Sequence, residues 1–119
     1  MSSDLQITQR SSGKVTILTL CGALVYEEAA HLRAAVTSAV HADARLFLLD
    51  LEQVTRLDSS GIGLLVAMFR HVTRHGGQLK LLRPSATARR VLGISHMTMV
   101  FDIFDDEGDA LLNLGGHAV

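Results

Sequence analysis

The chain has 119 residues, of which 48% are hydrophobic and 19% are charged, and its formal net charge at pH 7 is −1. This length suits one domain, and this composition argues against a disordered chain or a coiled coil. The absence of a basic excess argues against a protein that binds nucleic acid directly or attaches to an anionic membrane surface.

The cysteine content and the N-terminal segment indicate a reducing compartment. Cys21 is the single cysteine, so the chain cannot form an internal disulfide. Residues 1–13 are polar and lack the basic and then apolar regions of a secretory signal, and the most apolar stretch, 62–69, is too short to cross a bilayer. We therefore expect a cytoplasmic protein that forms one domain over residues 1–119, with no membrane insertion.

The apolar pattern of the first half predicts, in chain order, two strands, a helix and a third strand. Residues 5–8 have the composition of a short edge strand, and residues 14–21 alternate with the period of two that is typical of a strand. Residues 26–40 predict an amphipathic helix. Its apolar positions, at helical spacing, are Ala29, Leu32, Val36 and Val40. The unbroken apolar run 46–49 ends at Asp50 and is typical of a strand covered on both faces.

The remaining sequence predicts two more strands and three more helices. In chain order, the expected elements are a loop over 52–58, a helix over 61–74 ended by Gly76-Gly77, a strand over 78–82, a helix over 86–92 opened by Pro84, a strand over 99–104, and a helix over 107–114 closed by Gly115-Gly116. The expected inner stripe of the helix over 61–74 is Ile62, Leu65, Val66, Phe69 and Val72. Strands that alternate with helices predict an α/β fold, with a mostly parallel sheet and helices packed on it.

The most informative segment is 49–65, which reads LDLEQVTRLDSSGIGLL. Asp58 and Ser59 are both good N-cap residues, and Gly61 and Gly63 let backbone or partner atoms come close to the first helical turn. The unpaired N–H groups and the positive dipole end of such a helix favour an anion. The domain would therefore tolerate a phosphate on Ser59, and its charge would act on whatever surface docks there.

Three segments resemble one known family. The run D-L-x-x-V-x-x-L-D-S-S-G-I-G-L-L resembles the signature of the bacterial anti-sigma-factor antagonists of the STAS family. L-C-G-A-L after the second strand is similar to the family's L-x-G-x-L turn, and HGGQLKLLRPSATARRVLGI resembles its glycine turn, strand and following helix. The resemblance covers nearly the whole chain and implies the STAS fold, a four- to five-stranded mostly parallel sheet packed with four to five helices.

The same resemblance implies a non-enzymatic, phosphorylation-gated binding module without a cofactor. The acceptor would be Ser59, the first serine after Asp58, with Ser60 as an alternative acceptor or a local hydrogen-bonding group. The residues implied in the phospho-loop and in partner docking are Asp58, Ser60, Gly61, Ile62 and Gly63. The implied partners are an anti-sigma factor that is also a serine kinase of the histidine-kinase-like ATPase fold, and a metal-dependent serine phosphatase. Binding of the unphosphorylated chain to the kinase would release a sigma factor.

One position departs from the family pattern. Val25 stands where family antagonists usually carry an acidic residue, and Glu27 and Glu28 are the nearby acids that would substitute for it. The departure bears on recognition by the kinase rather than on the fold. It leaves open a second function, a STAS subunit of a bacterial ABC lipid transporter or of a stress-signalling scaffold.

Other patterns near the D-S-S-G segment have simpler interpretations. D-S-S-G by itself is an ordinary helix start. Gly61-x-Gly63 lacks the third glycine and the lysine of nucleotide-binding loops, and without a G-x-S-x-G elbow Ser59 does not indicate a hydrolase. His71 and His75 are i and i+4 on one helix but lack a third metal ligand, so a solvated helix face is expected. Cys21, among apolar neighbours, is expected to be a small core residue.

Two clusters of charge have no assigned role. Arg83, Arg89 and Arg90 either flank a helix or meet an acidic partner. The acidic cluster comprises Asp102, Asp105, Asp106, Glu107 and Asp109. Its simplest interpretation is a solvated, capped helix start.

Overall fold

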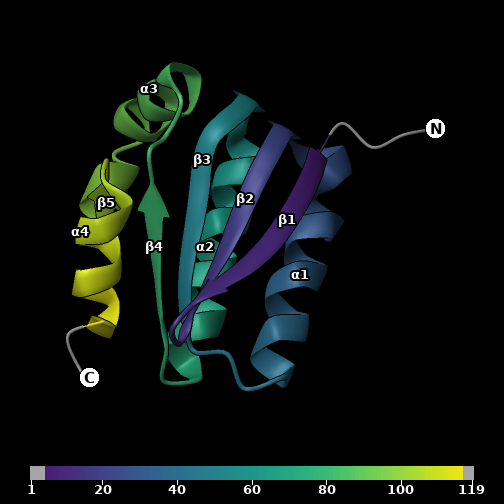
Figure 1. Ribbon diagram of the computed structural model, residues 1–119. Helices are drawn as coiled ribbons and strands as arrows, with labels where there is room; N and C mark the ends of the chain where they lie inside the picture. Colours follow the sequence, from purple (N-terminus) through teal and green to yellow (C-terminus); the bar gives the residue numbers. More distant parts are fainter. Residues whose placement is uncertain (1–4, 117–119) are drawn as a thin grey trace.

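The apolar segments of the chain form the strands of one mixed sheet with helices on both faces (Figure 1). The computed structural model describes residues 5–116. Its elements are β1 (Leu5–Ser12), β2 (Val15–Leu24), the 3-10 turn η1 (Tyr26–Glu28), α1 (Ala29–His41), β3 (Leu46–Leu57), α2 (Ser59–Arg74), β4 (Gln78–Leu82), α3 (Ala86–Ile94), the 3-10 turn η2 (Met97–Met99), β5 (Ile103–Phe104), α4 (Glu107–Leu111) and the irregular helical segment η3 (Leu112–Gly116).

The spatial order of the strands is β1-β2-β3-β4-β5. β1 runs antiparallel to β2, and each of the other neighbouring pairs is parallel. The described part of the chain therefore has five strands and four α-helices, and the predicted mostly parallel α/β sheet is confirmed. Parallel neighbours require crossover helices, which explains why helices separate β2, β3 and β4 in the sequence.

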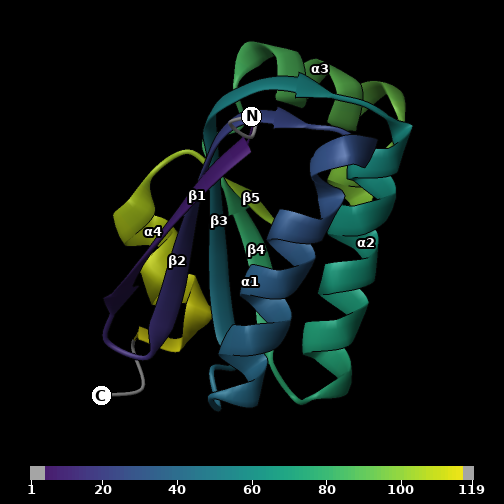
Figure 2. The same cartoon turned by 90° about the vertical axis from the view of Figure 1, so that its right-hand side faces the viewer.

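Two hydrophobic clusters lie on opposite faces of the sheet. The larger one joins the sheet to α1 and α2, and Ala88 and Leu92 of α3 belong to it. The smaller one packs Ala110 of α4 and Leu114 against the other face. Figure 2 shows α1 and α2 on one side of the sheet and α4 on the other. The central strand β3 is buried on both sides, as its apolar run predicts.

The expected loop over 52–58 is wrong, because β3 continues to Leu57. The strand keeps pairing with β2, but the register shifts between Thr19 and Cys21 and again between Gly22 and Ala23. Such β-bulges place extra residues on one strand and increase its bend. They also allow Leu51, Val54 and Leu57 to remain buried in the larger cluster although their spacing is three rather than two.

Several element boundaries also differ from expectation. β1 extends to Ser12, and a 3-10 turn precedes α1. The last strand shrinks to β5, because residues 97–99 form a 3-10 turn that follows His96 at φ 61°. Pro84 lies before the helix rather than in its first turn, since Ser85 is the N-cap of α3 and its Oγ accepts from the Ala88 N–H at 3.1 Å.

The buried stripe of α2 is rotated relative to the predicted one. Leu65 and Val72 are buried as expected, whereas the other three predicted positions, Ile62, Val66 and Phe69, are half-buried. The residues that complete the buried stripe are Gly61, Leu64 and Met68. The rotation follows from the environment of α2, which contacts α1 as well as the sheet.

The prediction that Cys21 lies in the core is also wrong, because its side chain is exposed. Its Sγ lies 3.3 Å from Oε1 of Gln53. The smaller cluster packs α4 against Val15, Ile17, Leu48 and Leu82, and Cys21 does not belong to it. Cys21 continues the alternation of Val15, Ile17 and Thr19 along β2, but the smaller cluster does not extend to it.

Candidate partner-docking site at the start of helix α2

Asp58 caps helix α2 and leaves Ser59 as the first helical residue. The backbone of Asp58 is extended, and its Oδ1 accepts a hydrogen bond from the Gly61 N–H at 2.9 Å. Its carbonyl accepts from the Ile62 N–H at 3.0 Å. Because Asp58 performs the capping, the exposed hydroxyl of Ser59 is not needed for it, and within the described residues that hydroxyl makes no hydrogen bond. Ser60 is half-buried.

Gly61 brings the start of α2 against the end of β2. A Cβ atom at this position would lie 2.2 Å from the carbonyl oxygen of Leu24 and 2.8 Å from Cδ1 of Leu57. The backbones of α2 and β2 therefore approach more closely than any side chain permits, and the turn after β2 is held beside Ser59. Gly63 differs: it is exposed, and a Cβ atom there would meet nothing within 4 Å. No contact with another described residue requires a glycine at position 63, so Gly63 leaves free space on the surface.

The turn after β2 contributes an aromatic side chain that sequence reasoning missed. Tyr26 is 74% exposed, directly after the buried Val25. Exposed tyrosines are enriched among the residues that dominate protein interfaces. The sequence signal that would have found Tyr26 is a large aromatic residue in a turn that the L-x-G-x-L similarity places close to the D-S-S-G segment.

The two acids near Val25 have different environments. Glu28 Oε1 accepts from the backbone N–H of Leu5 at 3.2 Å and lies 3.2 Å from Nδ1 of His31. Glu28 therefore interacts with β1 and α1, whereas Glu27 is exposed. Of the two proposed substitutes for the missing turn acid, Glu27 is the one that faces solvent.

The three arginines noted in the sequence do not form one surface. Arg83 pairs with Asp50 at 3.0 Å, and this hydrogen bond raises the pKa of the Arg83 guanidinium. Arg89 pairs with Asp105 at 2.6 Å. Arg90 is exposed and forms no ion pair with the described residues. Two of the three arginines therefore already form ion pairs within the molecule.

The acidic cluster is more structured than a solvated helix start. Asp106 does cap α4, accepting from the Asp109 N–H at 2.9 Å. Glu107 forms a two-pronged ion pair with Arg10 of β1, with distances of 2.6 and 3.1 Å, and this hydrogen bonding lowers the pKa of Glu107. Asp102 pairs with Lys80 of β4. These pairs connect α4 and the segment before β5 to the sheet.

Among the described residues, no group of three or more histidine, cysteine, aspartate or glutamate side chains could hold a metal ion. Over residues 5–116, no helix has the length and apolar character needed to span a membrane. The features found near the start of α2 are the exposed hydroxyl of Ser59, the positive end of the helix dipole and, in the turn after β2, the exposed ring of Tyr26.

Comparison with known proteins agrees with this architecture. The family model described as the STAS domain matches residues 6–110. An anti-sigma F factor antagonist from Paenibacillus polymyxa is 25% identical over 112 residues, which cover 93% of this chain and 96% of the relative.

Solved structures of anti-sigma factor antagonists share the fold. One from Mycobacterium paratuberculosis superposes with a TM-score of 0.82 at 19% identity, covering 92% of this chain and 93% of the other. Unphosphorylated SpoIIAA gives 0.77 at 24% identity, covering 94% and 96%. The phosphorylated form of the Bacillus protein gives 0.69 at 24% identity, covering 92% and 97%. Because the family model spans nearly all of the described residues, the chain belongs to the STAS domain family, in which its relatives include anti-sigma factor antagonists.

Proposed function

We propose that this chain is an anti-sigma factor antagonist whose binding is gated by phosphorylation of Ser59. In the unphosphorylated state it binds an anti-sigma factor, and this binding frees a sigma factor. The observation that carries the proposal is the exposed, non-capping hydroxyl of Ser59 at the first residue of α2. The names of the relatives support the partner class, and the phosphorylated form of SpoIIAA supports the kind of modification.

A phosphate on Ser59 is compatible with the fold. The N–H groups of Ser59 and Ser60 have no acceptor among the described residues, and the dipole of the 16-residue helix α2 favours negative charge at this end. The neighbouring carboxylate of Asp58 opposes the phosphate. Arg56 is exposed, lies two positions before Asp58 and forms no ion pair with the described residues, so it is available as a counter-charge. The modification therefore changes the surface without breaking the helix.

The same modification is large enough to control docking. A phosphate adds about −1.5 to −2 charges at pH 7 and three acceptor oxygens. If its desolvation and repulsion cost the complex about 3 kcal/mol, affinity falls roughly a hundredfold. The adjacent Tyr26 and Gly63 would lie under the docked partner, which makes the surface sensitive to a charge at its centre.

The proposal assigns no catalytic step to this chain. The kinase would be the anti-sigma factor itself, with the histidine-kinase-like ATPase fold, and a serine phosphatase would restore the hydroxyl. Both activities would act in the cytoplasm, and the chain would need no cofactor of its own.

The first experiment maps the modification in the native host. The chain is purified under conditions that preserve phosphate, and its peptides and its co-purifying proteins are identified by mass spectrometry. We expect phosphate on Ser59 and an ATPase of the stated fold among the partners.

The second experiment measures affinity for that ATPase with point variants. Ser59→Asp should bind about a hundredfold more weakly than the wild type, while Ser59→Ala should bind normally and resist phosphorylation. Thr73→Ala is the matched control, because it removes an exposed hydroxyl residue at the opposite end of the same helix, and it should bind and be phosphorylated normally. Wild-type affinity in Ser59→Asp would contradict the proposal.

The buried Val25 is the observation that favours a second function, since the turn lacks the acidic residue usual in antagonists. A STAS subunit of an ABC lipid transporter, or of a stress-signalling scaffold, would not need kinase recognition. Co-purification with a permease and its ATPase, without phosphate on Ser59, would favour the transporter.

A further inference from the structure

Two histidines lie side by side near the end of α2. His71 belongs to the last turns of the helix, and His75 is its C-cap residue. Their ring centroids are 4.6 Å apart, with an angle of 47° between the ring planes. Residues at i and i+4 share one face of a helix, so the backbone itself holds the two rings together.

The hydrogen bonding of His75 determines which of its nitrogens is available. Nδ1 of His75 lies 2.8 Å from the carbonyl oxygen of His71. A carbonyl oxygen only accepts, so Nδ1 carries the proton, and in the neutral ring the lone pair is on Nε2. A histidine that ligates a metal through one nitrogen typically donates the other N–H to a carbonyl or carboxylate, which fixes its tautomer and its orientation.

We propose that His71 and His75 form a two-histidine site for a divalent first-row transition-metal ion. Imidazole nitrogens suit Cu²⁺, Ni²⁺ and Zn²⁺, and water or a ligand from another molecule completes the coordination. This assignment goes beyond the solvated helix face expected from the sequence, because the hydrogen bond that orients the His75 ring is not visible in the spacing. It is independent of the proposed sigma-factor function.

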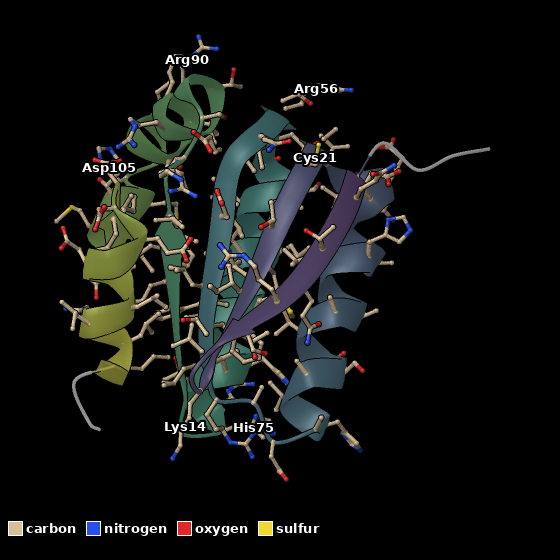
Figure 3. All side chains as sticks on the ribbon, in the orientation of Figure 1. Lys14, Cys21, Arg56, His75, Arg90 and Asp105 are labelled. Atoms are coloured by element: carbon tan, nitrogen blue, oxygen red, sulfur yellow. The ribbon has the colours of Figure 1, made fainter. Side chains whose placement is uncertain are left out.

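The surroundings favour weak rather than tight binding. Arg70 and Arg74 are exposed and form no ion pair with the described residues, so their positive charges act against a cation on the same helix. The carbonyl groups at the C-terminal end of α2 contribute the opposite, favourable dipole. Arg56 lies near the end of β3, three residues before Ser59, and His75 lies at the opposite end of the molecule (Figure 3). Metal binding is therefore not expected to obstruct the docking surface.

The test is calorimetric titration of the untagged chain with Ni²⁺, Cu²⁺ and Zn²⁺ in a non-coordinating buffer. We expect one ion per chain, with Cu²⁺ bound more tightly than Ni²⁺ or Zn²⁺. His71→Ala and His75→Ala should each weaken binding by about tenfold to a hundredfold. Arg74→Ala should strengthen it, and more so at low salt. Single variants that bind Ni²⁺ as tightly as the wild type would overturn the proposal.

A matched control separates this pair from the other histidines. A variant with the remaining four replaced by alanine changes His31, His41, His96 and His117. It should retain the site, and loss of binding in this variant would also overturn the proposal. Because the single variants affect the end of α2, their folding is checked by circular dichroism. A second readout needs no variant: in the NMR spectrum of the wild type, Cu²⁺ should broaden the ring signals of both His71 and His75. Broadening of other histidines instead would count against the pair.

Discussion

Substitution of the two glycines in the first turns of α2 should have opposite effects on stability. In Gly61→Ala, the new Cβ would lie 2.2 Å from the backbone oxygen of Leu24. Ordinary contacts begin at about 3.4 Å, so the end of β2 or the start of α2 must move by roughly 1 Å. Overpacking of this kind costs about 1–3 kcal/mol, while the higher helix propensity of alanine returns about 1 kcal/mol. We expect a net loss of about 1–2 kcal/mol, because the obstructing atom belongs to the backbone and not to a flexible side chain.

Gly63→Ala is the matched control, since the same methyl group is added to the same helix where nothing lies within 4 Å. It should stabilise the fold by about 0.5–1 kcal/mol through helix propensity alone. Urea denaturation followed by circular dichroism gives the free energy of unfolding of both variants. If Gly61→Ala were as stable as Gly63→Ala, the close approach of α2 to β2 would be refuted as the reason for glycine at position 61.

Three further variants test the cap, an ion pair and the docking surface. Asp58→Ala should lower the free energy of unfolding by about 1 kcal/mol through loss of the N-cap, and Asp58→Asn should restore most of it in the same urea assay. Arg10→Met should cost at most about 1 kcal/mol at neutral pH, because the ion pair is partly exposed. The pKa of Glu107 is lowered in the folded state, so the stabilisation by the ion pair is complete above the unfolded pKa of Glu107 and is lost as the pH falls through its folded pKa. Plots of unfolding free energy against pH for the wild type and Arg10→Met should therefore converge in acid. A constant difference between them would contradict a stabilising role for the Arg10–Glu107 pair. Tyr26→Ala should weaken binding to the anti-sigma factor by about 2 kcal/mol, or roughly thirtyfold, and Tyr26→Phe should bind nearly as the wild type; equal losses in titration calorimetry would show that the ring itself is not the anchor.

Local rules sufficed for the start of α2, because every group that forms the cap lies within five residues of sequence. Asp58 accepts from Gly61, and its carbonyl accepts from Ile62, as an N-cap pattern predicts. The place of Ser59 in the helix therefore follows from its neighbours in the chain. The approach of the turn that carries Tyr26 to the start of α2 does not, since it depends on the tertiary contact between Leu24 and Gly61.

Strand β3 shows where sequence patterns fail. Residues 52–58 are mostly polar and suggest a loop, but bulges let Leu51, Val54 and Leu57 occupy the core while the intervening residues face outward. A strict period of two cannot detect such a strand. The same limitation applied to Cys21. It fits the alternation of β2, but its side chain is exposed because the smaller cluster under α4 does not extend to it.

The ion pairs between residues far apart in the sequence could not be predicted from local patterns either. Arg10 and Glu107 are 97 residues apart, and Arg83 and Asp50 are 33 apart. Their pairing depends on strand order and on the placement of α4, which become known only when the whole sheet is assembled. Charges that suggest a free basic or acidic surface in the sequence are therefore largely paired in the folded chain.

The most direct test of the gating claim compares two forms of the wild-type chain. One is unmodified, and the other carries a single phosphate on Ser59 added by its own kinase, and both are titrated with the anti-sigma factor under identical conditions. We expect tight binding by the unmodified form and an affinity about a hundredfold lower for the phosphorylated form. Equal affinities would show that the charge at the start of α2 does not control docking.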